Sequence, residues 1–396
     1  MLAKLGLRCL GGGRTPSAPR CVGLAPGGCP AGPAGPAGPD PVAVRVGILS
    51  TASIARANCA AISKVTGLVV VCVGSRDLKK AEAFAREQGI ARAYGSYDEV
   101  LRDAQVDAVY VPLPTSLHKE WVLRCAAAGK HVLCEKPTAL SAEELREMLS
   151  ALAARGLCWL DATWFMHHDR LGAIRAERAG GLFGPLGFCH ASSSATFSGD
   201  ATFFETNIRV DPKLDALGCL GDLGWYCVRV ALFAFDWEPP QWASALLHVS
   251  KNGVPVDLSG TLTWRARPAA DVDSLPLVRT SSFHCSFLRA GQSAVTLQGR
   301  SGALLMDDFI TPRSADTAKW TVLAADGTAA VHETGTKCCE CANMWACFRD
   351  SLLAVRAGQR PAAFWSDISM LTQLVIDALL QSSRLGGAQV AVAKLA

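Results

Sequence analysis

Strands and helices alternate regularly through the first half of this sequence, and this alternation constrains the fold more than any other feature. Short β-branched runs predict strands at Val44–Leu49, Leu68–Val73, Val106–Val111, His131–Cys134 and Leu157–Leu160. Stretches that begin at a capping residue or end at glycine predict helices at Ser53–Ser63, Asp77–Gln88, from Ser96, at about Leu117–Ala128 and from Ser141. This spacing is typical of βαβ units, so we expect a parallel sheet covered on both faces.

The pattern changes after about Phe165. Apolar and polar residues alternate at Val256–Trp264, Ser281–Leu288 and Ala294–Gln298, which predicts antiparallel strands and hence a second domain. Two helical patterns close the chain, around Asn343–Arg356 and Asp367–Leu385. We therefore expect one domain at 42–164 and a second at 165–396.

Residues 1–41 differ in composition from the rest and consist largely of Gly, Pro, Ala and scattered Arg. Such a segment buries too little apolar surface to offset its chain entropy, so we expect a disordered tail. Spaced arginines without glutamate favour an organelle transit peptide, and a flexible extension or a mispredicted start is the alternative. The expected location is the cytoplasm, or a plastid or mitochondrion if the tail is a transit peptide.

The charge of the chain says little about its partners. The sequence has 39 basic and 35 acidic residues, a net charge of +4, and the tail carries four of the basic residues against the single acidic Asp40. No basic stripe marks a nucleic-acid binder, and no apolar run is long enough to span a bilayer. We expect neither a nucleic acid nor a membrane as a partner.

The sequence contains 16 cysteines, several of them in apolar strand-like runs. Reduced thiols in such positions behave as small hydrophobic side chains, which favours a reducing compartment. One dense group combines Cys338, Cys339, Cys341 and Cys347. A zinc site would need two separated pairs, so we expect packing or incidental thiols here and no metal, with metal binding as the alternative.

The turn after the first strand is a candidate phosphate-binding loop. It begins at Gly47, and the sites of a Gly-x-Gly-x-x-Gly turn are taken by Ser50, Ala52 and Ala55, with Ser53 and Ile54 at the start of the helix. Small residues let the backbone approach a pyrophosphate at a helix N-terminus. A tight turn without a ligand is the alternative interpretation.

The end of the second strand bears on the choice of cofactor. An acidic residue at the position of Ser75 would bind the adenosine ribose and select NAD, whereas Ser75 followed by Arg76 can hold a 2′-phosphate. NADP is therefore favoured over NAD. The alternative for Arg76 is a solvated residue in the first turn of a helix.

Three short motifs give the chain a family resemblance. They are Glu135-Lys136-Pro137, Pro114-x-x-x-His118, and the run from Gly221 to Tyr226. From about Val44 to Leu385 the chain resembles the Gfo/Idh/MocA oxidoreductases, and Asn207-Ile208-Arg209 with Leu217–Tyr226 is most similar to the branch of dihydrodiol dehydrogenases, D-xylose dehydrogenases (NADP) and their plant-type relatives. The resemblance implies an α/β fold, with a Rossmann domain followed by an α+β domain whose open-faced, mostly antiparallel sheet forms a homodimer surface.

The resemblance also implies roles for single residues. Lys136 matches the family's active-site lysine, Tyr226 its proton-exchanging group, and Asp222 a residue that orients the pair or the sugar hydroxyls. A phenol, with a pKa near ~10, can exchange a proton with a substrate hydroxyl if the Lys136 cation lowers that value. The structural alternatives are an ion pair of Lys136 with Glu135 or Asp222 and a core role for Tyr226.

Further residues are implied at the edges of the site. The expected cofactor contacts include Pro112, Pro114, His118, Glu135 and Lys136, and the expected substrate contacts are Trp164, His167 and Tyr226, with His168 nearby. For the histidines a structural hydrogen-bonding role is the alternative. Ser50 departs from the family's usual first glycine, which bears on cofactor affinity more than on fold.

These features together predict an NADP-dependent dehydrogenase that acts on a cyclic polyol or sugar, at an aldose C1 or on a trans-dihydrodiol. Two alternatives remain open. One is a catalytically silent NADP-binding sensor or scaffold, suggested by the altered phosphate turn, and the other is a nicotinamide-dependent glycosidase.

Overall fold

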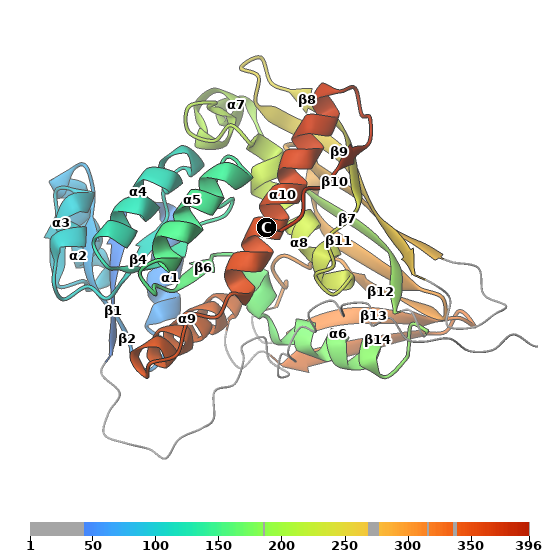
Figure 1. Cartoon of the computed structure of the whole chain (residues 1–396), viewed down its shortest axis with the longest axis horizontal. Coiled ribbons are helices and arrows are strands. Elements are labelled where there is room, and N and C mark those ends of the chain that lie inside the picture. Colours follow the sequence, from blue (N-terminus) through green and yellow to red (C-terminus); the bar gives the residue numbers. More distant parts are fainter. Residues whose placement is uncertain (1–42, 185–186, 268–276, 315–316, 336–338, 396) are drawn as a thin grey trace, which may run out of the picture.

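The computed structural model describes residues 43–184, 187–267, 277–314, 317–335 and 339–395. Two sheets organise this part of the chain, one in each half, with helices α9 (Glu340–Arg356) and α10 (Phe364–Arg384) between them (Figure 1). The predicted tail at 1–41 lies outside the described residues.

The first sheet has six parallel strands in the order β3-β2-β1-β4-β5-β6. The strands are β1 (Val44–Leu49), β2 (Leu68–Gly74), β3 (Arg92–Tyr94), β4 (Ala108–Val111), β5 (His131–Cys134) and β6 (Trp159–Asp161). The connecting helices are α1 (Ser53–Ile62), α2 (Leu78–Gln88), α3 (Tyr97–Arg102), α4 (Thr115–Ala127) and α5 (Ala142–Ala153). The strand order reverses between β1 and β4, which is the Rossmann topology and confirms the expected parallel sheet.

Local capping explains why the helices start where they do. The Ser96 and Ser141 side chains accept hydrogen bonds from the backbone N–H groups of Glu99 and Glu144, so both predicted capping residues are confirmed. Asp77 caps α2 from outside, one residue before the helix begins. The predicted start of the fourth helix was two residues late, since Thr115 opens it, and the short strand β3 was not predicted.

The second sheet has nine strands in the order β14-β13-β12-β11-β7-β10-β9-β8-β15. The strands are β7 (Phe188–Ser198), β8 (Trp242–Val249), β9 (Pro255–Arg267), β10 (Leu277–Ser286), β11 (Leu288–Gly299), β12 (Gly302–Met306), β13 (Thr317–Ala324), β14 (Ala329–Gly335) and β15 (Val390–Ala391). Neighbours are antiparallel except β7 and β10, which run parallel. The sheet is therefore mostly antiparallel, as expected, but mixed.

Short helices connect and cover this second sheet. They are η1 (Trp164–His167), α6 (Asp169–Ala179), α7 (Ala201–Thr206), η2 (Ile208–Val210), the π-helical turn η3 (Leu220–Gly224) and α8 (Trp225–Ala234). Helix α8 is buried along its whole length and packs on β7 and β10. The opposite face of the sheet is open and forms a shallow depression of about 630 Å³ lined by residues of β7–β11, many of them serine and threonine.

The two C-terminal helices join the halves of the molecule. Helix α9 packs on α1 and η1, and α10 packs on α5, β6, α8 and β8 (Figure 1). Both helices therefore contact the parallel half as well as the second one, and the domain boundary at 164/165 stays a prediction.

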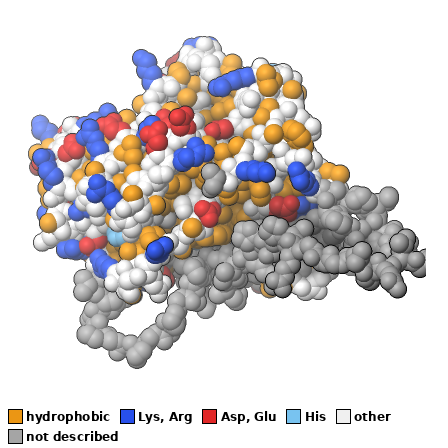
Figure 2. All heavy atoms as spheres, in the orientation of Figure 1, with side chains coloured by type: hydrophobic (Ala, Val, Ile, Leu, Met, Phe, Trp, Pro, Cys, Tyr) orange, Lys and Arg blue, Asp and Glu red, His pale blue; other side chains and the backbone are white. Residues whose placement is uncertain are grey.

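The surface is mixed in charge. On the face shown in Figure 2, acidic and basic side chains are interspersed among apolar ones. None of the helices within the described residues is both long enough and apolar enough to cross a bilayer.

Candidate active site

A cavity of about 570 Å³ opens at the carboxyl edge of the parallel sheet. Its walls come from the loops after β1, β4, β5 and β6, and from the segment around η2 and η3. Ligands of open parallel sheets bind at this edge, where the strand order reverses. The predicted residues that line the cavity are Ser50, Ala52, Ser53, Ile54, Arg76, Pro112, Pro114, Glu135, Lys136, Trp164 and Asp222.

The turn after β1 has an unusual backbone conformation at Ser50, the residue that takes the place of the family's usual first glycine. Ser50 has a φ of 124°, a region that favours glycine, and its hydroxyl accepts a hydrogen bond from the Ala52 N–H at 3.0 Å. No side chain caps α1, and Ser53 and Ile54 of its first turn face the cavity. The positive end of the helix is therefore directed at a place where an anion can bind.

Other predicted residues of this end lie beneath the cavity. A Cβ on Gly47 would come within 2.7 Å of the Val100 side chain, so Gly47 permits α3 to pack closely on β1. Ala55 is fully buried in α1, and the buried Ser75 hydroxyl accepts a hydrogen bond from the Asp77 N–H. Arg76, by contrast, lines the cavity beside Tyr97.

Glu135 is held by a buried chain of hydrogen bonds that reaches α9. Trp345 donates to Asn58, the Asn58 amide donates to the Tyr110 hydroxyl at 2.8 Å, and that hydroxyl donates to Glu135 Oε1 at 2.6 Å. The second carboxyl oxygen of Glu135 accepts the backbone N–H of Lys136. Burial raises the pKa of Glu135, and the Tyr110 hydrogen bond opposes this rise. This chain of hydrogen bonds sets the position of the loop that presents Lys136.

Lys136 forms the centre of a cluster of charges. Its Nζ lies 2.7 Å from Asp222 Oδ1 and 2.8 Å from the Asp222 backbone carbonyl, and Arg209 Nε lies 2.9 Å from Asp222 Oδ2. Burial alone would raise the pKa of Asp222, but the charges of Lys136 and Arg209 outweigh it and the pKa is lowered. Asp222 is therefore an anion that fixes both cations.

Tyr226 lies next to this cluster, one helical turn after Asp222 as predicted. Lys136 Nζ lies 4.8 Å from the centre of the Tyr226 ring. The expected lowering of the Tyr226 pKa is wrong: burial, and then the charges of Glu135 and Asp222, raise it well above its ordinary value. The phenol is therefore protonated and can donate a proton or a hydrogen bond, but it is a poor base. Its side chain is 3% exposed and is not part of the cavity lining.

The three predicted histidines hold structural positions outside the cavity. His118 is buried, with Nε2 2.8 Å from the Leu113 carbonyl and Nδ1 3.2 Å from the Thr138 carbonyl, so it ties the loops after β4 and β5 together. His167 stacks on Trp365, and burial lowers its pKa to about 3. Burial also lowers the pKa of His168 to about 4, and its ring caps α6. None of the three lines the cavity.

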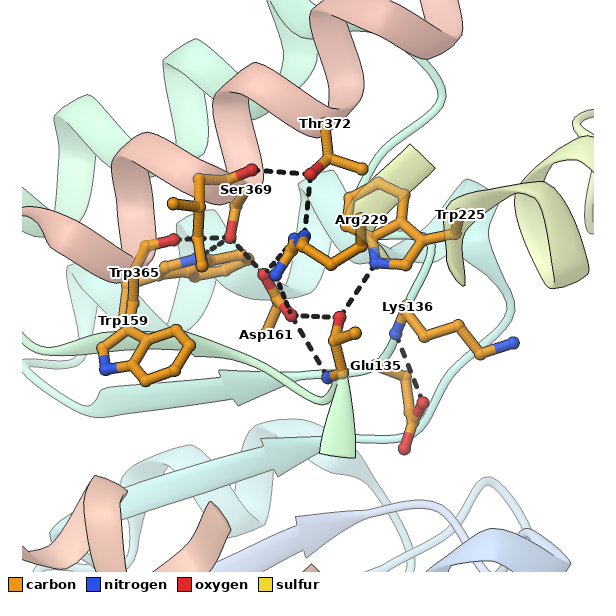
Figure 3. Close-up of polar contacts among 11 residues, drawn as sticks. Glu135, Lys136, Trp159, Asp161, Trp225, Arg229, Trp365, Ser369 and Thr372 are labelled. Atoms are coloured by element: carbon orange, nitrogen blue, oxygen red, sulfur yellow. Dashed lines mark hydrogen bonds and ion pairs between the residues drawn. The ribbon is translucent and has the colours of Figure 1, made fainter. Parts of the chain in front are cut away.

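A second buried network holds α8, and with it Tyr226, against the parallel half (Figure 3). Arg229 NH2 lies 2.8 Å from Asp161 Oδ2, and both side chains are at most 1% exposed. Asp161 also accepts hydrogen bonds from Ser369 and from the Thr163 side chain and backbone, and Trp225 donates to Thr163. The network joins β6, α8 and α10 beneath the cavity.

Several residues that line the cavity had no role assigned to them from the sequence. They are Ala57, Tyr97, Leu113, Thr115, Leu117, Ile208, Arg209 and Asp215. Ile208 and Arg209 lie in a segment that carried the family resemblance, which was the available signal for them. Asp215 had no such signal, and neither did Asn58, Tyr110 or Trp345.

None of the described cysteines of the predicted thiol group lines the cavity. Cys338 lies outside the described residues, and Cys339, Cys341 and Cys347 lie at or within α9. Over the described ranges, no three or more His, Cys, Asp or Glu side chains are placed to hold a metal ion.

The fold and the cavity define the class of a Rossmann-type oxidoreductase, and comparisons with known proteins specify the family. Residues 44–161 match the model of the Gfo/Idh/MocA family, described as an oxidoreductase family with an NAD-binding Rossmann fold. Over 244 residues the chain is 33% identical to trans-1,2-dihydrobenzene-1,2-diol dehydrogenase of Bos taurus, covering 61% of this chain and 68% of the bovine protein. The chain belongs to this family of NAD(P)-dependent oxidoreductases.

Other relatives agree with this assignment. An uncharacterized oxidoreductase, ORF334 of Rhizobium meliloti, is 39% identical over 203 residues, which are 50% of this chain and 57% of that protein. The crystal structure of KijD10, a 3-ketoreductase from Actinomadura kijaniata, in complex with NADP and TDP-benzene has a TM-score of 0.74 and 25% identity, and the match covers 86% of this chain and 98% of that one. An aldose-aldose oxidoreductase from Caulobacter crescentus shares the fold, with a TM-score of 0.74 at 20% identity over 88% of this chain and 99% of its own.

Proposed function

We propose that this chain is an NADP-dependent oxidoreductase that moves hydride between the nicotinamide and a hydroxyl-bearing carbon of a cyclic polyol or sugar. The observation that carries the proposal is Lys136, presented in the cavity, paired with Asp222 and placed beside the Tyr226 ring. The names of the relatives, which include trans-1,2-dihydrobenzene-1,2-diol dehydrogenases and a 3-ketoreductase, support this type of reaction.

The residues around the cavity fit a dinucleotide. The uncapped N-terminus of α1 and the small residues Ser50, Ala52 and Ser53 suit a pyrophosphate, and Arg76 lies where a 2′-phosphate would need a cation. The solved 3-ketoreductase was crystallised with NADP, which supports the same choice here. When bound, the cofactor supplies the hydride chemistry.

The chain's own residues then divide the remaining work. Lys136 donates a hydrogen bond to the reacting oxygen and stabilises negative charge on it. Tyr226 is protonated because its pKa is raised, and it lies beside Lys136 rather than in the cavity wall, so we assign it a supporting role as the proton donor behind Lys136 when a carbonyl is reduced. Asp222 positions Lys136 and shares its charge with Arg209.

The test is NADP-linked absorbance against a panel of aldoses and trans-dihydrodiols, with wild type and Lys136→Ala. We expect the variant to lose a factor of ~10²–10⁴ in kcat, because it removes the group that stabilises charge on the reacting oxygen. Lys119→Ala is the matched control, since Lys119 pairs with Glu147 at the surface. Absence of turnover by wild type, or full activity of Lys136→Ala, contradicts the proposal.

The cofactor preference has its own test. Arg76→Ala should weaken NADP binding about 10- to 100-fold and leave NAD binding unchanged, because a charged hydrogen bond to the 2′-phosphate is lost. Calorimetric titration of both cofactors measures this, with Arg86→Ala on α2 as the control. An equal loss for the two cofactors would show that Arg76 does not bind the 2′-phosphate.

We also propose that two copies pair through the open face of the second sheet. The face presents Leu246, whose side chain is 65% exposed, among serine and threonine residues. A second sheet of the same kind would cover this side chain. Light scattering should report a dimer for wild type and a monomer for Leu246→Arg.

A further inference from the structure

Asp215 has an unusual environment for a carboxylate. It lies in the short segment between η2 and η3, is 6% exposed, and contributes to the cavity wall. Its Oδ1 atom is fully buried and has no hydrogen-bond partner among the described residues. Buried polar atoms are nearly always paired, so an unpaired carboxyl oxygen at a cavity indicates a position kept for a ligand.

The charges around Asp215 explain why it stays unpaired. Lys136 and Arg209 lie close enough to influence it, but both are bound to Asp222. Asp222 itself repels Asp215. Burial, and then the charge of Asp222, raise the pKa of Asp215 to about 7, and Lys136, Arg209 and the Leu217 N–H only partly oppose them. The cluster therefore contains one carboxylate that is satisfied and one that is not.

An unpaired hydrogen-bond donor belongs to the same cavity as this unpaired acceptor. Trp164 Nε1 is also buried without a partner among the described residues, and Trp164 lines the same cavity. A ligand that satisfies both atoms must offer a donor and an acceptor. Hydroxyl groups do both, whereas an anionic group would accept from Trp164 but be repelled by the Asp215 and Asp222 carboxylates.

We propose that Asp215 is a substrate-binding residue whose free oxygen accepts a hydrogen bond from the second hydroxyl of a neutral vicinal diol. The first hydroxyl of that diol lies at Lys136. This assignment rests on the proposed function, because it takes Lys136 to mark the reacting oxygen. The proposed function assigns the adenosine end of the cofactor to Ser53 and Arg76, whereas Asp215 lies within electrostatic reach of Lys136.

The test compares the binding of a diol and a mono-alcohol of the same ring. Trans-1,2-cyclohexanediol and cyclohexanol are titrated by calorimetry into the full chain, with and without saturating NADPH. Above the Asp215 pKa of about 7, where this carboxyl is ionised, wild type should bind the diol at least about tenfold more tightly, as expected for one hydrogen bond to a charged group. Asp215→Leu should abolish this preference, and Asp215→Asn, which keeps one acceptor oxygen, should reduce it less.

Controls separate a binding role from a structural one. Asp211→Asn, a carboxylate of the same segment that caps the Lys213 N–H outside the cavity lining, should behave as wild type. NADPH affinity should be equal in all these variants. With a turned-over diol, Asp215→Leu should raise KM about tenfold or more and change kcat less.

The outcomes are distinct. A diol preference that survives in Asp215→Leu, a wild type without any preference, or a parallel loss of NADPH binding would overturn the assignment. A wild type that prefers the diol through Asp215 but transfers no hydride would contradict the proposed function and leave the role of Asp215 in binding intact.

Discussion

Two buried aspartates, Asp161 and Asp215, show how differently the same side chain is used in two regions of this molecule. Both are almost inaccessible to solvent. Asp161 has partners on both oxygens, including the Arg229 guanidinium, and its pKa is lowered because these partners outweigh burial. Asp215 has one oxygen without a partner among the described residues, and burial raises its pKa to about 7. The two carboxyl groups are similarly buried, with 1% of Asp161 and 6% of Asp215 exposed, so the difference lies mainly in their partners.

The difference follows the roles of the two regions. The Asp161 network ties β6, α8 and α10 together and is closed to solvent. The Asp215 region borders the cavity, where the strained backbone of Ser50 is also found. Unsatisfied groups and backbone strain gather where a ligand is expected, and complete pairing occurs where elements must be held together.

The largest effect is expected from a substitution that breaks the buried network around Asp161. Arg229→Met should lower the free energy of unfolding by ~3–5 kcal/mol, because it leaves the Asp161 carboxylate buried without its cation. Urea denaturation followed by fluorescence measures this. Arg56→Met, which removes an exposed pair with Glu87, should have a much smaller effect, because solvent screens that pair. Similar losses in the two variants would show that the network does not behave as a closed unit.

The next largest effect is the pH dependence of stability that comes from the unpaired carboxyl group of Asp215. The folded-state pKa of Asp215, about 7, lies above the value of about 3.9 expected in the unfolded chain. The folded state therefore keeps a proton that the unfolded state releases, and stability from this group is full below about pH 4 and is lost as the pH rises through about 7. Asp215→Asn cannot titrate, so its stability relative to wild type should rise over this range by up to about 4 kcal/mol.

Unfolding midpoints at several pH values, measured for wild type, Asp215→Asn and the control Asp211→Asn, give this difference directly. The Asp211 variant should run parallel to wild type. If the Asp215→Asn difference does not change with pH, then Asp215 is already ionised in the folded state and the contrast with Asp161 disappears.

The smallest effect concerns Ser50. Its φ of 124° costs ~1–3 kcal/mol, and its hydrogen bond to the Ala52 N–H returns about 1 kcal/mol. Ser50→Ala keeps the strain and loses the hydrogen bond, so it should be about 1 kcal/mol less stable than wild type, while Ser50→Gly relieves the strain and should be more stable than Ser50→Ala. Thermal unfolding of the three proteins gives the order, and a Gly variant less stable than the Ala variant would argue against strain at this turn.

Prediction from sequence worked best where the determinants are local. The capping serines Ser96 and Ser141 and the strands at Val44–Leu49 and His131–Cys134 were predicted correctly because capping and β-branched runs depend on neighbours in the chain. The parallel pairing of β7 with β10 was not predicted. Its partners are far apart in the sequence, since nearly 90 residues separate the paired residues His190 and Thr280.

The site divides in the same way. Lys136 and Asp222 could be located because short motifs mark them, and Trp164 because it comes just after a predicted strand; the cavity contains all three. The pKa of Tyr226 was expected to fall through Lys136, but burial, and then the nearby charges of Glu135 and Asp222, raise it instead. Electrostatic balance in a buried site depends on every charge in reach, and the sequence alone does not show which charges those are.

The sequence by itself determined the parallel half of the fold, the family resemblance and one central residue of the cavity, Lys136. Periodicity, helix caps and motifs depend on residues that are close together in the chain. The tertiary structure alone decided that Asp161 is paired and Asp215 is not, that Tyr226 keeps its proton, and that Trp345, Asn58 and Tyr110 support Glu135 from across the molecule. The physical reason is that partners and burial are properties of segments brought together by folding, and these segments are far apart in the chain.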